Sequence, residues 1–261
     1  MNADYHLHTS FSDDSEYDME ELIKKAINMN LDEICFTEHI DYGVDGDHVI
    51  DYDAYFDRIH QLRDKYKSKI TIKQGIEFGI QKHTIPRYEN DLSKYDFDFV
   101  ILSNHQVNDQ QFWNGEYQEN KTQKEINVGY YEAILDVIEN FTGYSVLGHL
   151  DMVKRYDNFG IYPDELVKDL LISILKRVIQ DGKGIEINTS CYRYGLPDLT
   201  PSTYILKLYH ELGGNIITLG SDTHSEEHLS FKIAEVREVL KNIGFRQFCT
   251  YNKMIPTFHD L

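Results

Sequence analysis

Two pairs of residues with a spacing of two could each bind a metal ion. His6 and His8 lie in the segment HLHTSFSDD, and Asp222 and His224 lie in GSDTH. On an extended strand, side chains two residues apart point to the same side, so both members of a pair can contact one cation. A single His-x-His pair is also common as two surface or turn histidines. The two pairs together favour a metal site if the fold makes them neighbours.

Other potential ligands follow apolar segments. Glu77 ends the run ITIKQGIE, His39 lies in FTEHID, and His105 and His149 follow the apolar runs in VILSNH and SVLGH. A carboxylate at the end of a buried strand needs a partner, either a metal ion or a Lys or Arg side chain. Each of these histidines, taken alone, could instead be a core or rim residue. A mixture of His, Asp and Glu without Cys suits Zn²⁺, Mn²⁺ or Fe²⁺.

Motifs for other kinds of catalysis are missing from the sequence. It contains no G-x-x-x-x-G-K-[ST] phosphate loop, no G-x-S-x-G elbow, no H-E-x-x-H motif and no dinucleotide-binding G-x-G-x-x-G. Metal-dependent catalysis is therefore the chemistry that the sequence favours.

Short apolar runs alternate with segments of helical periodicity along the 261 residues, which favours repeated βα units. We predict seven strands, at residues 3–7, 33–37, 70–76, 97–103, 144–148, 184–188 and 216–220. We predict helices at residues 19–29, 53–66, 123–140, 164–180, 201–212 and 231–242, and a shorter one at 86–92. The simplest fold is α/β, a distorted parallel (β/α)7 barrel similar to a TIM barrel, with residues 1–261 as a single domain. An open, doubly wound sheet is the alternative.

The potential ligands lie at the C-terminal ends of the predicted strands. In chain order they are His6 and His8, Glu38 and His39, Glu77, His105, His149 and Asp151, and Asp222 and His224. In a β/α barrel these strand ends meet at one mouth, where active sites are built. The first and last strands of a closed barrel are neighbours, so the two pairs with a spacing of two would lie side by side.

The composition is acidic. Lys and Arg number 26 against 44 Asp and Glu, which gives a formal net charge of −18. This charge repels nucleic acids, so we expect no nucleic-acid partner, whereas bound divalent cations could reverse the local charge and admit a small anion. Cys35, Cys191 and Cys249 are too few and too scattered for a disulfide framework. No segment resembles a signal peptide or a membrane span, so we expect a cytoplasmic protein with no membrane partner. The oligomeric state stays open.

The ordered segments HLHTSFSDD, FTEHID, GIEFG, SNH, GHLD and GSDTH resemble those of the polymerase and histidinol phosphatase (PHP) family of metal-dependent phosphoesterases. They extend from residue 6 to residue 224, nearly the whole chain. The compact length, the EHID segment and the lack of a polymerase domain are similar to the stand-alone histidinol-phosphate phosphatases of that family. The resemblance implies a distorted seven-stranded barrel that holds three divalent metal ions.

The resemblance also implies nine metal ligands: His6, His8, Asp14, His39, Glu77, His105, His149, Asp222 and His224. The first ion would be held by His6, His8, Glu77 and Asp222. Glu77 would bridge to the second ion, held also by His105 and His149, and His39 and His224 would hold the third. Relatives often carry His at the position of Asp14, and Asp13 is nearly as plausible a ligand.

We expect a metal-dependent phosphomonoesterase that hydrolyses L-histidinol phosphate, as in histidine biosynthesis. Our hypothesis is that a metal-activated water attacks the phosphorus in line, with Glu77, Asp222 and His224 as candidate catalytic residues. Arg155 is the first candidate for binding the phosphate and Arg193 the second, although either could be a solvated surface arginine. His48 is a candidate for contact with the substrate. It could also, like Asp222 or His224, protonate the leaving group.

Other functions stay open, namely a PHP-type nuclease or phosphodiesterase, a phosphatase for another small ester, and a barrel that binds a partner without catalysis. The expected substrate depends on the loops at residues 41–53 and 106–122. They contain Asp45, Asp47, Asp51, Asp109, Glu116 and Glu119, with Tyr42, Trp113 and Tyr117. Acids and aromatic rings at the mouth would suit a substrate with a cationic organic half. The alternative is that these acids belong to the solvated surface.

Overall fold

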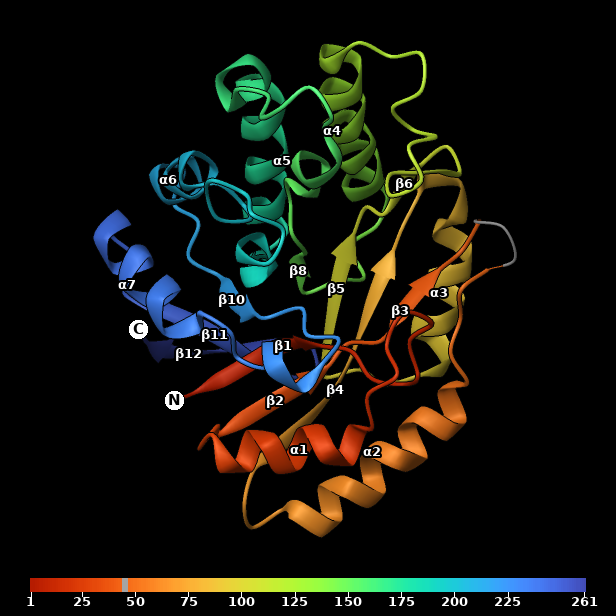
Figure 1. The fold of residues 1–261 in the computed structure, drawn as a ribbon, viewed down its shortest axis with the longest axis vertical. Coiled ribbons are helices and arrows are strands. Elements are labelled where there is room, and N and C mark those ends of the chain that lie inside the picture. Colours follow the sequence, from red (N-terminus) through yellow and green to blue (C-terminus); the bar gives the residue numbers. More distant parts are fainter. Residues whose placement is uncertain (44–46) are drawn as a thin grey trace.

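The computed structural model describes residues 1–43 and 47–261, and its centre is a parallel sheet rolled into a barrel (Figure 1). Adjacent strands pair in parallel in the order β1 (Ala3–Leu7), β2 (Glu33–Phe36), β4 (Thr71–Gly79), β5 (Phe99–Ser103), β8 (Val146–Leu147), β9 (Gly184–Asn188) and β10 (Ile217–Gly220). These are the seven predicted strands in chain order. The predicted parallel barrel is confirmed, and the open sheet is wrong.

The barrel is nearly closed, and the closing contacts lie at the end that carries the predicted ligands. The backbone N–H of His8 donates to the carbonyl of Thr223 at 2.9 Å, and the N–H of Thr223 donates to the carbonyl of His6 at 3.2 Å. Thr223 follows β10, so these bonds join the C-terminal ends of the first and last strands. The segments HLH and SDTH, which are more than 200 residues apart in the sequence, become neighbours.

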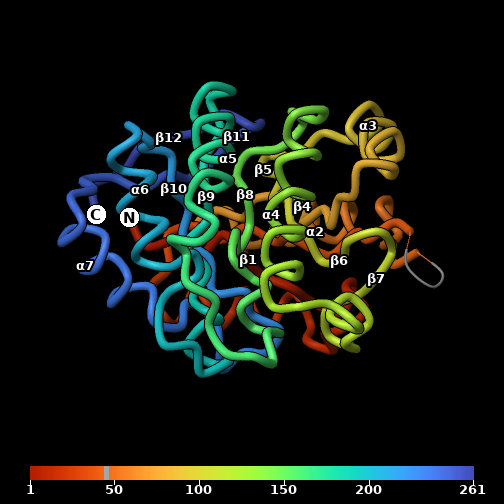
Figure 2. The backbone as a smooth tube through the Cα atoms, turned by 90° about the horizontal axis from the view of Figure 1, so that it is seen from above, coloured from red at the N-terminus to blue at the C-terminus, as the bar shows by residue number. Residues whose placement is uncertain are grey.

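Helices surround the strands on the outside (Figures 1 and 2). They are α1 (Met19–Asn28), α2 (Tyr52–Tyr66), α3 (Ile85–Lys94), α4 (Gln123–Asn140), α5 (Lys168–Gln180), α6 (Thr203–Glu211) and α7 (Ile233–Ile243). Polar caps start several of them, as where the Thr122 side chain accepts from the N–H of Glu125 at the start of α4. Within the described ranges, no helix has the length and apolar character needed to cross a membrane.

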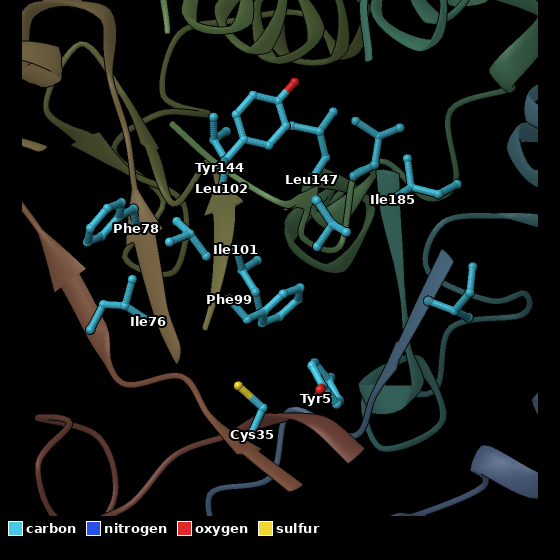
Figure 3. Close-up of a cluster of buried hydrophobic side chains, with 14 of the residues drawn as sticks. Tyr5, Cys35, Ile76, Phe78, Phe99, Ile101, Leu102, Tyr144, Leu147 and Ile185 are labelled. Carbon is cyan, nitrogen blue, oxygen red and sulfur yellow. The ribbon is translucent and has the colours of Figure 1, made fainter. Parts of the chain in front are cut away.

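The core lies between and within the strands, which supply buried apolar side chains on both faces (Figure 3). Tyr5 of β1 and Phe99 of β5 meet edge to face at a centroid distance of 5.1 Å. Strands covered on both sides read as continuous apolar runs, which is why the sequence revealed all seven.

Five short or late strands were not predicted. β3 (His39–Asp41) pairs with β4, and β6 (Gln106–Val107) pairs with β7 (Gln110–Gln111) inside the loop after β5. An antiparallel hairpin of β11 (Gln247–Asn252) and β12 (Ile255–Asp260) ends the chain. The N–H of Tyr251 donates to the Tyr5 hydroxyl at 2.8 Å, and the Tyr251 hydroxyl donates to the carbonyl of Ser145, just before β8. The hairpin therefore lies against the N-terminal end of the barrel.

Some predicted boundaries need correction. β4 continues to Gly79, so Glu77 lies inside the strand and not after it. The strand predicted at residues 144–148 contracts to Val146–Leu147. The helix predicted from residue 164 begins with a 3₁₀ turn, Asp164–Val167, before α5.

Candidate metal centre

A cavity of about 730 Å³ opens at the C-terminal ends of the strands. Its walls come from the segments that follow β1, β3, β5, β8, β9 and β10. The lining residues include Asp13, Asp14, His39, Asp41, His48, His105, Trp113, His149, Arg155, Tyr156, Arg193, Tyr194, Asp222, His224 and His228. The mouth of the barrel is therefore rich in groups that bind metals and anions.

Glu77 lies at the centre of the predicted ligands. Its fully buried carboxylate is within 3.4 Å of a ring nitrogen of five histidines, namely His6, His8, His39, His105 and His149. The structure places it in two groups of close donor atoms, one with His6 and His149 and one with His39 and His105. A carboxylate shared by two such groups has the position required of a bridging ligand.

The two pairs with a spacing of two meet beside Glu77. His6, His8 and Asp222 form a buried group of potential ligands, and His8 forms a second group with the partly exposed His39 and His224. The His8 ring stacks between those of His39 and His224, with centroids 4.2 and 4.3 Å away. Closure of the barrel produces this arrangement.

The two adjacent acids of the segment FSDDS have different partners. Asp14 Oδ2 lies 3.5 Å from His39 Nε2 and 3.0 Å from His224 Nε2. Asp13 instead pairs with His48 Nδ1 at 2.5 Å. Of the two acids, Asp14 therefore has the position expected of a ligand at the third site.

Charges in the cluster shift the pKa values of its members. Burial alone would lower the pKa of His6, but Glu186, Glu77 and Asp222 raise it well above the usual value. Burial and the neighbouring His39 and His224 hold the pKa of His8 well below the usual value. Despite burial, the adjacent histidines hold the pKa of Glu77 well below its usual range. These pKa shifts favour an ionised Glu77 and a neutral His8, the protonation states that bind divalent ions, and binding of an ion to His6 would release its proton.

A further observation indicates that these residues are suited to bind metal ions. His8 Nε2 is buried and faces Glu77 and Asp222 at 3.4 and 3.6 Å, yet it makes no hydrogen bond to any residue of the described ranges. An unpaired buried imidazole nitrogen is costly. A cation between this nitrogen and the two carboxylates would satisfy all three groups.

Two carboxylates that the sequence analysis overlooked orient the histidines from behind. Glu186 of β9 contacts His6 Nδ1 at 2.5 Å and accepts from the backbone N–H of His149 at 2.9 Å. Asp41 contacts His105 Nδ1 at 2.9 Å. Such contacts fix which ring nitrogen faces a metal. Glu186 interrupts the apolar run of GIEIN, and Asp41 repeats the spacing of two from His39, so the sequence contained a signal for both.

Glycine is required where β10 passes Glu186. A Cβ atom on Gly220 would collide with the Glu186 carboxylate and with the Cβ of His6, which would lie 2.5 Å away. The absent side chain at this position leaves the room that the carboxylate needs to reach His6.

The two predicted phosphate-binding arginines lie at the cavity and approach Asp222 differently, Arg155 through the carboxylate at 3.8 Å and Arg193 through the backbone. The Arg155 guanidinium lies 3.7 Å from the ring centroid of Tyr194 and donates to the Ser190 hydroxyl at 2.6 Å. Arg193 donates from both terminal nitrogens to backbone carbonyls, those of Ser221 at 2.7 Å and Asp222 at 2.6 Å. Arg193 therefore holds the Asp222 loop, and Arg155 keeps more donors for an anion in the cavity.

Comparison with known proteins decides the family. The model of the PHP domain matches residues 4–190. The chain belongs to the PHP family. A histidinol-phosphatase of Lactococcus lactis is 35% identical over 96% of this chain and 94% of its own length. A probable histidinol-phosphatase of Clostridium acetobutylicum is 30% identical, with 94% and 95% of the two chains covered.

Solved structures agree with the PHP assignment. The crystal structure of histidinol phosphate phosphatase from Lactococcus lactis, in complex with zinc, L-histidinol and phosphate, has a TM-score of 0.89 at 35% identity and covers 98% of both chains. A putative histidinol phosphatase from Listeria monocytogenes has a TM-score of 0.80 at 21% identity, with 90% of this chain and 99% of its own covered. This second likeness concerns the fold alone.

Several acids expected around the mouth of the PHP barrel have other roles. Asp47 pairs with Arg87, Asp51 caps α2, and Asp109 pairs with His83. Glu116 and Glu119 are exposed outside the cavity, and Asp45 lies outside the described residues. Of the three aromatic residues considered for the mouth, Trp113 lines the cavity, whereas Tyr42 and Tyr117 are buried elsewhere.

Glu38 and Asp151, two acids at the ends of predicted strands, also lie apart from the predicted metal ligands. Glu38 accepts hydrogen bonds from Thr9 and Ser12, and Asp151 pairs with the buried Lys154 at 2.8 Å. Both carboxylates are fully buried, so they need these hydrogen bonds and this cation as partners.

Proposed function

We propose that this PHP protein is a metal-dependent phosphomonoesterase that hydrolyses L-histidinol phosphate to L-histidinol and phosphate. The central support is the position of Glu77, which is shared by two groups of potential ligands whose members His39, His105 and His149 line the cavity. The Lactococcus lactis relative, similar over nearly the whole chain, is a histidinol-phosphatase whose crystal structure contains zinc, L-histidinol and phosphate.

We further propose three divalent ions, of zinc, manganese or iron. His6, His8, Glu77 and Asp222 would hold one, Glu77, His105 and His149 the next, and Asp14, His39 and His224 the last. When bound, such ions lower the pKa of coordinated water and neutralise the charge of a phosphoryl group. Sites built from His, Asp and Glu without Cys accept several of these ions, and elemental analysis of the purified protein gives their number and identity.

Side chains of the protein would orient the phosphate ester. Arg155 can make paired hydrogen bonds to two phosphoryl oxygens, since its planar guanidinium is held against Tyr194. Arg193 would act on Asp222, whose backbone it binds. Asp222, His224 and His48 all line the cavity. Of these, His224 and His48 are the better candidates for protonating the leaving alkoxide, because, despite burial, neighbouring histidines and Arg155 hold the pKa of Asp222 far below its usual range and keep it ionised.

A nuclease or phosphodiesterase activity is the second candidate, because it uses the same metal chemistry. The net charge of −18 disfavours it.

The three cysteines are free and buried, as a cytoplasmic location would require, and we propose that location.

Purified protein incubated with L-histidinol phosphate, glycerol phosphate and a short single-stranded DNA tests the proposal. Elemental analysis of the same sample gives the metal content. We expect release of phosphate from histidinol phosphate, dependence on bound metal, and no cleavage of DNA. Cleavage of DNA faster than of the monoesters would favour the second candidate.

A further inference from the structure

The cavity has cationic and anionic walls that come from different strands. Arg155 and Arg193 lie on the segments after β8 and β9. Asp13 lies on the segment after β1, and its partner His48 follows β3, to which it is joined by backbone hydrogen bonds with Asp41 at 2.8 and 2.9 Å. A ligand with an anionic and a cationic end would match this distribution of charge.

Asp13 is the cavity carboxylate that is not engaged with a predicted metal ligand. Asp14 contacts His39 and His224, Asp41 contacts His105, and Asp222 contacts His6, His8 and His224. Within the described residues, Asp13 has His48 as its ionic partner, and half of its side chain is exposed. Asp13 and His48 both line the cavity, so the carboxylate lies within reach of a ligand there and outside the groups of potential metal ligands.

We infer that Asp13, supported by His48, binds the cationic end of the substrate and makes the enzyme selective for phosphate esters that carry a protonated amine. This inference rests on the proposed function, and it adds the residue that recognises the organic half of the substrate. Trp113, half exposed on the same cavity, offers an aromatic surface for a ring or a cation of that half. A carboxylate that pairs with an ammonium group contributes a charge-assisted hydrogen bond.

The substitution Asp13→Asn tests the inference because it removes the charge and keeps the size. We expect KM for L-histidinol phosphate to rise by about 10-fold or more, as for loss of a hydrogen bond to a charged group. We expect kcat/KM for glycerol phosphate, which has no cationic group, to fall by a clearly smaller factor than kcat/KM for L-histidinol phosphate, and the zinc content to stay at the wild-type level. Asp13→Glu should restore part of the selectivity.

Asp109→Asn is the matched control. Asp109 is also half exposed and also pairs with a histidine, His83 at 3.1 Å, but it does not line the cavity. We expect this variant to treat both substrates as the wild type does.

The inference is overturned if Asp13→Asn leaves KM for histidinol phosphate unchanged, or if it lowers activity on both esters equally. Loss of zinc from Asp13→Asn would also overturn it, since Asp13 would then be a metal ligand. Failure of the proposed function is seen in a different sample: wild-type protein would show no preference for histidinol phosphate.

Discussion

Glu77 makes more contacts with histidines than its neighbour Asp222, which lies within 3.8 Å of three. We expect Glu77→Gln to lose most of its metal and activity, because the neutral amide is a poorer ligand and leaves the surrounding histidines without their counter-charge. Asp222→Asn should have the same direction of effect. Elemental analysis and phosphate release measure both. The exposed Glu116→Gln should match the wild type, and full metal content with normal turnover in Glu77→Gln would contradict the ligand assignment.

The two arginines should give different defects. Arg155→Ala should lower kcat/KM by about 10²-fold or more with normal metal content, because it removes a donor to the phosphoryl group. Arg193→Ala should also reduce metal content, since it releases the loop of Asp222, a residue with a φ of 54°. Measurement of metal content and steady-state kinetics on both variants distinguishes the roles. Metal loss in Arg155→Ala but not in Arg193→Ala would mean that the roles of the two arginines must be exchanged.

Much of the candidate site was predictable residue by residue, because parallel strands deliver their C-terminal residues to one place. All nine predicted ligands lie together at the mouth, although their roles as ligands remain a prediction. The residues around the organic half were not predictable, since they depend on how loops fold. In the structure, Asp47 pairs with Arg87 and Asp51 caps α2. The structure also shows that Asp13 lines the cavity without contacting a predicted metal ligand.

At the scale of elements, the strands were predictable and the final hairpin was not. Two-residue hairpins are usually recognised by Asn-Gly or a similar pair, because both turn residues need a positive φ. Here Lys253 and Met254 occupy the turn with φ of 49° and 62°, so that signal is absent. β3 was also hidden, because three residues are too few for a periodic pattern.

The hairpin should stabilise the barrel without taking part in the site. Phe248 of β11 is 1% exposed and lies under the Arg237 guanidinium at 4.5 Å. We expect Phe248→Ala to lower the free energy of unfolding by about 3–5 kcal/mol, as for other buried aromatic truncations. Denaturant unfolding measures it, with Phe258→Ala as control, since Phe258 of β12 is 41% exposed. Equal stability of the two variants would show that the hairpin is not part of the core.

At the scale of the whole molecule, metal should stabilise the fold. Glu77 and Asp222 are buried together, and a divalent ion offsets their mutual repulsion as well as the net charge of −18. A ligand that binds only the folded state raises its stability. We expect chelation to lower the melting temperature by about 5 °C or more, and added zinc to reverse the change. An unchanged melting temperature after verified metal removal would contradict this.

The prediction that residues 1–261 form a single domain belongs to the same scale. β1 and β10 close the barrel, and the terminal hairpin contacts Tyr5 of β1 and Ser145 before β8, so both ends of the chain contribute to one core. A single cooperative unfolding transition, followed by both circular dichroism and tyrosine fluorescence, is the expected behaviour.

The most direct test of the central claim is the ratio of kcat/KM for L-histidinol phosphate to that for glycerol phosphate, measured on metal-loaded wild-type protein and again after chelation. Both esters present the same phosphoryl group, and only histidinol phosphate carries cations for the anionic wall of the cavity. We predict a ratio of about 10 or more for the loaded protein and loss of both activities on chelation. A ratio near one, or activity that survives removal of the metal, would contradict the account.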